Sequence, residues 1–140
     1  MGEIAVKLLL DSVILIDHFN NVTQASEYIA KHQADISLSV ITRAEVLTGF
    51  HTKQHLHLAK QLLDNFKLLP LTVIEADLAA SLRQTYHWKL PDAFQAAFAK
   101  HHRLKLVTRN TKDFNPAIHD FVKVPYVTPF STYALTKNSN

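Results

Sequence analysis

The chain has 140 residues, of which 47% are hydrophobic, and its formal net charge is +3. This length suits a single domain with a buried core, and the hydrophobic content argues against disorder. Because the chain contains no cysteine, a disulfide scaffold, a thiolate metal site and a thiol nucleophile are all excluded. The opening residues do not resemble a signal peptide, and no apolar run reaches the ~18 residues that a membrane span requires. We therefore expect a cytoplasmic protein without a membrane segment.

Strand and helix patterns alternate along the chain. Helical patterns cover residues 12–19, 23–34, 41–49, 52–66, 73–88 and 91–103, and short apolar runs predict strands over 5–10, 36–39, 68–71, 105–108 and 121–124. Such alternation predicts an α/β fold with three layers, in which helices flank both faces of a mostly parallel sheet of four or five strands. No linker interrupts the pattern, so we expect one domain over residues 1–130 and a polar tail over 131–140.

Local motifs mark some helix ends and exclude some functions. Thr42, followed three residues later by Glu45, resembles a capping box, and Gly49 suits a helix end. Pro91 and Asp92 suit a helix start. The chain has only two glycines, so it contains neither a phosphate-binding P-loop nor a dinucleotide-binding fingerprint.

Four acidic residues lie where a strand gives way to a helix or loop, or where a helix opens: Asp11, Glu45, Asp92 and Asp113. Parallel α/β sheets place their chemistry at the carboxyl ends of the strands. Each acid also has a structural explanation. Glu45, expected in the first turn of a helix, and Asp92 would complement the helix dipole, and Asp113 would stabilise a turn.

Together, the four acids predict a metal site. Carboxylates that converge on one spot repel one another, so their pKa values rise unless a cation lies between them. Ligation by oxygen alone indicates Mg²⁺ or Mn²⁺. Many basic residues lie between residues 89 and 112, close to two of the acids, as expected of an enzyme that acts on a phosphate backbone. A solvated helix face followed by a turn would explain the same basic cluster.

Four segments resemble the motifs of PIN-domain ribonucleases, in the right order and at plausible spacing: Leu10–Asp17, Ser39–Val46, Pro91–Ala97 and Val107–Phe114. The similarity is closest to the VapC type, the toxin half of bacterial and archaeal toxin–antitoxin pairs. It covers about residues 5–130. The resemblance implies a PIN-like sheet flanked by helices, a Mg²⁺ or Mn²⁺ site, an RNA substrate, a homodimer and a cognate antitoxin that plugs the active site.

The resemblance also assigns individual residues. Asp11, Glu45 and Asp92 match the family's acids, and Asp113 is favoured as the fourth acid and metal ligand over the neutral Asn110. Ser12 and Thr108 match hydroxyl groups that would hydrogen-bond the carboxylates or a phosphate oxygen. Asn110 could orient a metal-bound water. The position of Val13 usually holds Asn or Ser in the family, so one polar group is missing.

The expected reaction is metal-dependent endonucleolytic hydrolysis of RNA. The four acids would hold one or two ions that activate water and clamp the scissile phosphodiester. Arg109 would contact phosphate or, alternatively, face solvent in its loop. The alternative function is a degenerate PIN module that binds RNA or a partner protein without cutting, which the departures at Val13 and Asn110 leave open. A response-regulator receiver would need an early acidic pair and a late lysine, which the sequence does not show.

The remaining polar residues are interpreted as structural. His51, His55 and His57 are expected on a polar helix face, because no acid or further histidine stands at the offsets of a zinc motif. His101 and His102 are expected to end a helix, where a cation suits the dipole. Asp17 is expected at the surface end of the first helix.

Overall fold

A computed structural model describes residues 6–127 of the chain; the predicted tail over 131–140 lies outside the described residues. Within that range the strands are β1 (Leu8–Leu10), β2 (Ile36–Ser39), β3 (Lys67–Leu69), β4 (Lys105–Val107) and β5 (Val122–Lys123). The helices are α1 (Ser12–Phe19), α2 (Thr23–His32), α3 (Val40–Thr48), α4 (Lys53–Leu63), α5 (Val73–Tyr86) and α6 (Leu90–His102), with a short 3-10 turn at Gln33–Asp35. None of the helices in this range is both long enough and apolar enough to cross a membrane.

The five strands form one parallel sheet in the order β3-β2-β1-β4-β5. The predicted α/β architecture with a parallel sheet of four or five strands is therefore confirmed. The chain builds the sheet outward from β1 in one direction, and then returns to build β4 and β5 on the other side. In open parallel sheets this reversal of direction leaves a crevice at the carboxyl ends of the central strands.

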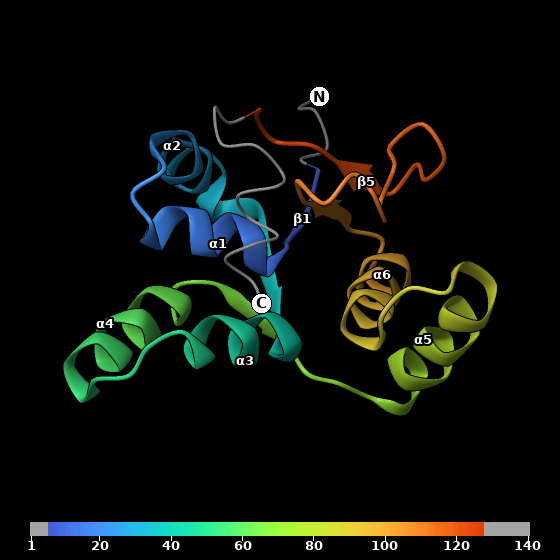
Figure 1. Cartoon of the computed structure of the whole chain (residues 1–140), viewed down its shortest axis with the longest axis horizontal. Helices are drawn as coiled ribbons and strands as arrows, with labels where there is room; N and C mark the ends of the chain where they lie inside the picture. Colours follow the sequence, from blue (N-terminus) through green and yellow to red (C-terminus); the bar gives the residue numbers. More distant parts are fainter. Residues whose placement is uncertain (1–5, 128–140) are drawn as a thin grey trace, which may run out of the picture.

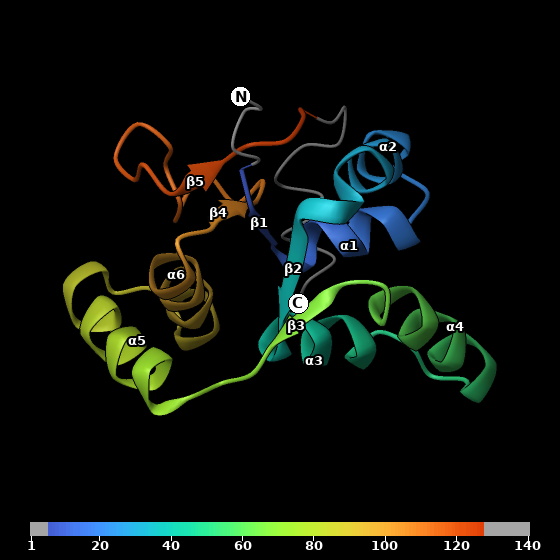
Figure 2. The same cartoon turned by 180° about the vertical axis from the view of Figure 1, so that it is seen from behind.

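Helices cover both faces of the sheet, as the two views show (Figure 1, Figure 2). On one face, α5 and α6 pack against Leu9 and Leu106 around the buried Phe98. On the other face, α1, α2, α3 and α4 pack against Leu8 and Leu10. Successive residues of β1 thus point to opposite faces, and all three are buried, which explains why the strand reads as an unbroken apolar run.

One predicted helix boundary differs from the structure for a physical reason. The expected capping box at Thr42 and Glu45 is wrong, because α3 begins earlier and Ser39 accepts the capping hydrogen bond from the Thr42 N–H. Glu45 consequently lies beyond the first turn of α3. A capping box does form at the start of α5, between Thr72 and Glu75. The predicted helix end at Gly49 and the proline-led start of α6 are both found.

Candidate active site

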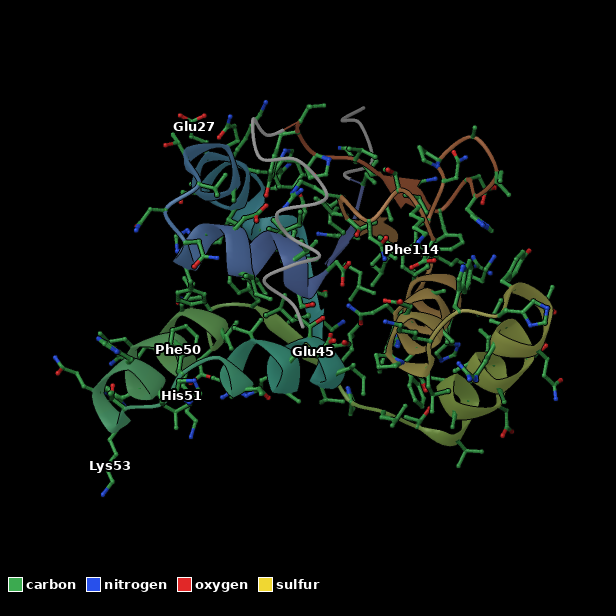
Figure 3. All side chains as sticks on the ribbon, viewed as in Figure 1. Glu27, Glu45, Phe50, His51, Lys53 and Phe114 are labelled. Carbon is green, nitrogen blue, oxygen red and sulfur yellow. The ribbon has the colours of Figure 1, made fainter. Side chains whose placement is uncertain are left out.

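The structure brings the four predicted acids to the carboxyl edge of the sheet. Asp11 follows β1 and caps α1, whereas Glu45 lies on α3, which follows β2. Asp92 lies in the first turn of α6, and Asp113 lies in the loop after β4. Figure 3 shows Glu45 on α3, near the middle of the molecule, whereas His51 and Lys53 lie farther out toward α4. Segments distant in sequence therefore meet at the carboxyl edge of the sheet, where the order of the strands reverses.

Asp11 is the most deeply held of these acids, with 7% of its surface exposed. The Thr108 hydroxyl donates a hydrogen bond to Oδ2 at 2.7 Å, and the Ser12 N–H donates to Oδ1 at 2.9 Å. The Gln95 side-chain amide reaches Oδ1 at 3.3 Å. Burial raises the pKa of Asp11, although these three hydrogen bonds oppose the rise. The carboxylate is thus fixed in orientation and yet poorly compensated in charge.

Gln95 connects the elements that carry the site. Its amide nitrogen donates to the Thr42 hydroxyl at 2.6 Å, and its carbonyl oxygen accepts from the Ser39 hydroxyl at 2.6 Å. Together with its contact to Asp11, these bonds join α6, the β2–α3 junction and the end of β1. Gln95 itself is only 1% exposed, so every one of these bonds is made away from water. The sequence analysis did not single out Gln95, Ser39 or Thr42 for this role.

The charges of the other three acids all affect the pKa of Asp92. Its pKa is raised to about 7, first by burial and then by repulsion from Asp11, Asp113 and Glu45, and Lys89 lowers it only in part. Loss of solvent around Glu45 and repulsion from Asp11 also raise the pKa of Glu45, against a hydrogen bond from Ser12. The acids therefore share one electrostatic field. Within residues 6–127, however, no three of them place their oxygen atoms within 4.8 Å of one another.

The loop after β4 supplies the fourth acid and its neighbours. The Asn110 side-chain amide donates to Asp113 Oδ2 at 3.1 Å, so these two candidates for the fourth position lie side by side. The Trp88 indole N–H donates to the Asp113 carbonyl oxygen at 3.0 Å. Thr108, which is fully buried, accepts a hydrogen bond from the Asn110 N–H at 3.0 Å. This loop is thereby tied both to Asp11 and to the segment that precedes α6.

Arg109 is engaged in an ion pair with Asp17. Its guanidinium makes two hydrogen bonds to the Asp17 carboxylate, at 2.7 and 2.9 Å, and Tyr126 donates a third at 2.9 Å. The expected surface position of Asp17 is wrong, because this side chain is only 2% exposed. This bidentate pair uses two of the guanidinium N–H donors, and the Arg109 side chain is only 9% exposed, which disfavours a contact with phosphate. The tie between α1 and the β4 loop was missed because it joins residues far apart in the sequence.

Two groups of histidines differ in their surroundings. His51, His55 and His57 are exposed, as expected, and no metal-binding group in the described part of the chain includes them. His101 and His102 end α6, also as expected, but their side chains approach the buried carboxylate of Glu75. No local pattern predicts this contact, because Glu75 lies on the preceding helix.

Comparison with known proteins supports one relationship. Residues 8–116 match the PIN domain family. The protein "Ribonuclease VapC10" of Mycobacterium tuberculosis is 28% identical over 129 residues, which cover 87% of this chain and 95% of the relative. A solved toxin–antitoxin complex from Klebsiella pneumoniae contains a chain that is 34% identical, with a TM-score of 0.78, over 87% of this chain and 100% of that chain. DNA-bound VapBC from Salmonella typhimurium, 18% identical over 79% of this chain and 91% of that chain, shares the fold with a TM-score of 0.69.

The fold and its acidic edge define a parallel α/β protein with a carboxylate-rich site where the order of the strands reverses. The chain belongs to the PIN domain family. The resemblance to VapC-type proteins that the sequence motifs predict is confirmed.

Proposed function

We propose that this protein is a VapC-type toxin: a metal-dependent endoribonuclease that hydrolyses RNA phosphodiester bonds. The observation that carries the proposal is the placement of Asp11, Glu45, Asp92 and Asp113 at one edge of the sheet, where burial and the neighbouring acids raise the pKa of Asp92 to about 7. Such an arrangement is unfavourable for a folded protein unless the charges serve a ligand. The similarity to a protein named as a VapC ribonuclease indicates which ligand chemistry to expect.

The donor set fits a hard divalent cation. Asp11, Glu45, Asp92 and Asp113 offer only oxygen ligands, which suit Mg²⁺ or Mn²⁺ rather than a thiolate-seeking metal. When bound there, the cation would activate a water molecule and neutralise charge on the scissile phosphate. The pKa values of Asp11, Glu45 and Asp92 are raised, and a bound cation would lower them by stabilising the ionised carboxylates.

The surrounding side chains would hold the acids in position. Gln95, Thr108 and the Ser12 N–H fix Asp11 before any ligand arrives, and Ser12 also supports Glu45. Positioning of this kind raises metal affinity and prevents the carboxylates from turning away from one another. Asn110 would hold Asp113 in the same way through its amide.

Exposed lysines, rather than Arg109, would contact the phosphate groups of the RNA. Lys89 is exposed, precedes α6 and lies near enough to Asp92 to lower its pKa, and Lys112 is exposed beside Asp113. Both would attract the phosphate backbone of RNA toward the acidic centre. Arg109 would instead keep the β4 loop in place through its pair with Asp17.

The partners of the protein follow from the same relationship. Since the similar solved structures include a toxin–antitoxin complex and VapBC, we expect a cognate antitoxin that covers the acidic edge. We also expect a homodimer, and action on RNA in the cytoplasm.

Cleavage of a labelled RNA pool tests the proposal. The purified chain, free of any antitoxin, is incubated with Mg²⁺, with Mn²⁺ and with EDTA, beside the variants Asp11→Asn and Asp92→Asn. We expect cutting only with a divalent ion, and a loss of at least about a hundredfold in each variant, as for the removal of other transition-state stabilisers. Asp77→Asn is the matched control, because Asp77 is an exposed acid on α5.

Two outcomes would contradict the ribonuclease. Cutting that persists in EDTA, or that survives both substitutions, would place the activity elsewhere or in a contaminant. No cutting with either ion by a folded protein that still binds RNA would favour the degenerate module. In that module, Val13 and Asn110 stand where the family carries groups that serve catalysis.

A further inference from the structure

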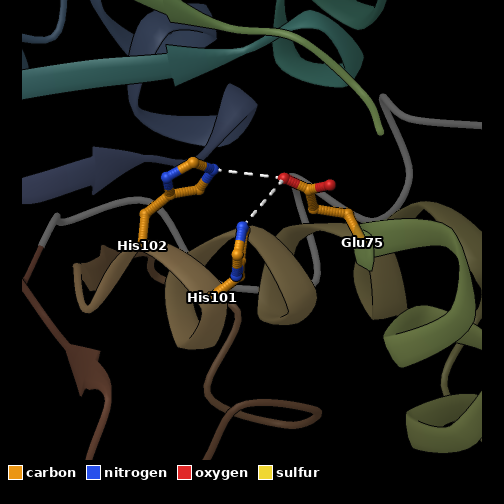
Figure 4. Close-up of side chains that lie close together, drawn as sticks. All are labelled: Glu75, His101 and His102. Carbon is orange, nitrogen blue, oxygen red and sulfur yellow. Dashed lines mark hydrogen bonds and ion pairs between the residues drawn. The ribbon is translucent and has the colours of Figure 1, made fainter. Parts of the chain in front are cut away.

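A second cluster of ligating side chains lies between α5 and α6. The Nε2 atom of His102 lies 3.2 Å from Oε1 of Glu75, and Nε2 of His101 lies 3.9 Å from the same oxygen (Figure 4). All three donor atoms lie within 4.8 Å of one another. Two adjacent histidines at the end of α6 thus point their ring nitrogens at a single carboxylate from the preceding helix, α5.

This cluster lies at the opposite edge of the sheet from the four acids. His102 lines a hollow of about 320 Å³ together with Lys7, Ile36 and Lys67, which lie at the amino ends of their strands. The four acids follow the carboxyl ends of the strands or lie on the helices above them. The cluster therefore shares no residue with the proposed active site.

The two oxygen atoms of the Glu75 carboxylate have different partners, and only Oε1 faces the histidines. The Thr72 N–H donates to Oε2 at 3.1 Å as one half of the capping box of α5, and the Thr72 hydroxyl also donates to this oxygen. Oε1 faces the two imidazole rings instead. Burial acts to raise the pKa of Glu75, but the hydrogen bonds from Thr72 and His102 outweigh it, so the pKa is lowered and the carboxylate is ionised at neutral pH.

The histidine rings are held in place but remain open to solvent. The His102 ring lies nearly parallel to the fully buried Phe98, with an interplanar angle of 13°, and the two histidine rings meet edge to face. The side chains of His101 and His102 are 35% and 31% exposed, whereas Glu75 is 1% exposed. An ion could thus enter from solvent and meet a buried anionic ligand behind two imidazoles.

We propose that Glu75, His101 and His102 form a binding site for a divalent transition-metal ion, with Zn²⁺ as the best fit. Tetrahedral Zn²⁺ with bonds of about 2.0–2.1 Å places neighbouring donor atoms about 3.3 Å apart, close to the 3.2 and 3.9 Å found here. Two imidazoles and one carboxylate are a common ligand set for zinc, with water in the fourth position. The bound ion would fasten the start of α5 to the end of α6.

Zinc titration of the whole protein tests this site without any RNA. The imidazole nitrogens are followed by NMR while Zn²⁺ is added in the presence of excess Mg²⁺, which competes for the oxygen-only acids. We expect the ring resonances of His101 and His102 to shift with the first equivalent and those of His55 and His57 to stay. We also expect zinc to raise the melting temperature, because an ion that binds only the folded state stabilises it.

Affinity measurements on variants complete the test. His101→Ala and His102→Ala should each weaken zinc binding by at least about tenfold, since even the loss of an outer partner weakens metal sites by about 10- to 100-fold. Glu75→Gln retains the capping geometry but not the charge, and should also weaken binding. His55→Ala is the matched control. Binding that survives the His101 and His102 substitutions, or zinc that leaves their ring signals unmoved, would overturn the proposal whatever the RNA assay shows.

Discussion

The two edges of the sheet hold buried carboxylates whose pKa values move in opposite directions. At the carboxyl edge, burial and neighbouring acids raise the pKa of Asp92 to about 7. At the amino edge, the side chain of Glu75 is only 1% exposed, yet its pKa is lowered because Thr72 and His102 hydrogen-bond its charged form. Burial alone therefore does not decide the ionisation of a carboxylate in this fold. The difference lies in whether the neighbours are donors or further acids.

Two buried acids near the carboxyl edge, Asp17 and Asp11, also differ in the charge of their hydrogen-bond donors. Asp17 is almost fully buried, but Arg109 and Tyr126 supply three hydrogen bonds to it. Asp11 is also buried, and its three donors are neutral groups. The first acid is a satisfied structural partner, whereas no cation within residues 6–127 forms an ion pair that would balance the charge of the second when it is ionised. An unbalanced charge of this kind is the feature that distinguishes a site from a structural element.

Removal of Arg109 should have the largest effect on stability. Arg109→Met would leave the buried Asp17 carboxylate without its cation, and breaking a buried pair typically destabilises a protein by about 3–5 kcal/mol. Urea denaturation measures this loss in the free energy of unfolding. The double variant Arg109→Met with Asp17→Leu should recover part of it, because no uncompensated charge remains. A loss below about 1 kcal/mol would show that the pair behaves like an exposed one.

Replacement of Gln95 should come next. Gln95→Leu keeps the volume of the side chain but leaves the hydroxyls of Ser39 and Thr42 and the Asp11 carboxylate with fewer partners. We expect a loss of about 2–3 kcal/mol from the unsatisfied buried groups. The pKa of Asp11 should rise further, because one of the hydrogen bonds that lowers it is gone. Carbon-detected NMR of the Asp11 carboxyl measures this shift, and Gln54→Leu on the exposed face of α4 is the control.

Neutralisation of Asp92 should stabilise the metal-free protein. Asp92 ionises near pH 7 in the folded chain and near 3.8 ordinarily, so between these values the folded state holds the extra proton. Its contribution to stability therefore falls as the pH rises through that window. We expect Asp92→Asn to gain about 1–2 kcal/mol at pH 8 in EDTA, after allowance for solvent screening. Denaturation curves should show the gain shrinking as the pH falls toward 4, and a constant gain would contradict the raised pKa.

The fold could be predicted from the sequence because a buried strand appears as a short run of apolar residues, which can be recognised without knowledge of its partners. The run Leu8–Leu10 is buried on both faces and reads as a central parallel strand, and most predicted helices match the observed ones closely. The acids were predicted for the same reason, since each follows a strand pattern or lies where the sequence pattern opens a helix. Glu45 shows the limit of local reading: its role as a cap was inferred from spacing to Thr42, but Ser39 caps the helix.

The parts that sequence reasoning missed are contacts between distant segments. Gln95 sits on an apolar helix and meets Ser39, 56 residues away, which no periodicity reveals. Asp17 looked like a surface residue because its partners, Arg109 and Tyr126, lie about a hundred residues later. The polar groups inside a core are paired by tertiary geometry, whereas the apolar ones follow the period of their own helix or strand.

The smallest effect is expected at the amino edge. In EDTA, Glu75→Ala should lose about 1 kcal/mol from the capping box, whereas Glu75→Gln should lose less because glutamine can still accept from the Thr72 N–H. Because the pKa of Glu75 is lowered in the folded chain, its charge stabilises the fold above the unfolded value of about 4.3, and this part is lost as the pH falls through the lower folded value. The loss of stability in Glu75→Gln should therefore be full at pH 7 and vanish at low pH, whereas the change that vanishes at low pH in Asp92→Asn is a gain of stability. Denaturation of both variants at pH 7 and at pH 3 measures the two changes, and changes of the same sign at pH 7 would remove the contrast between the two edges.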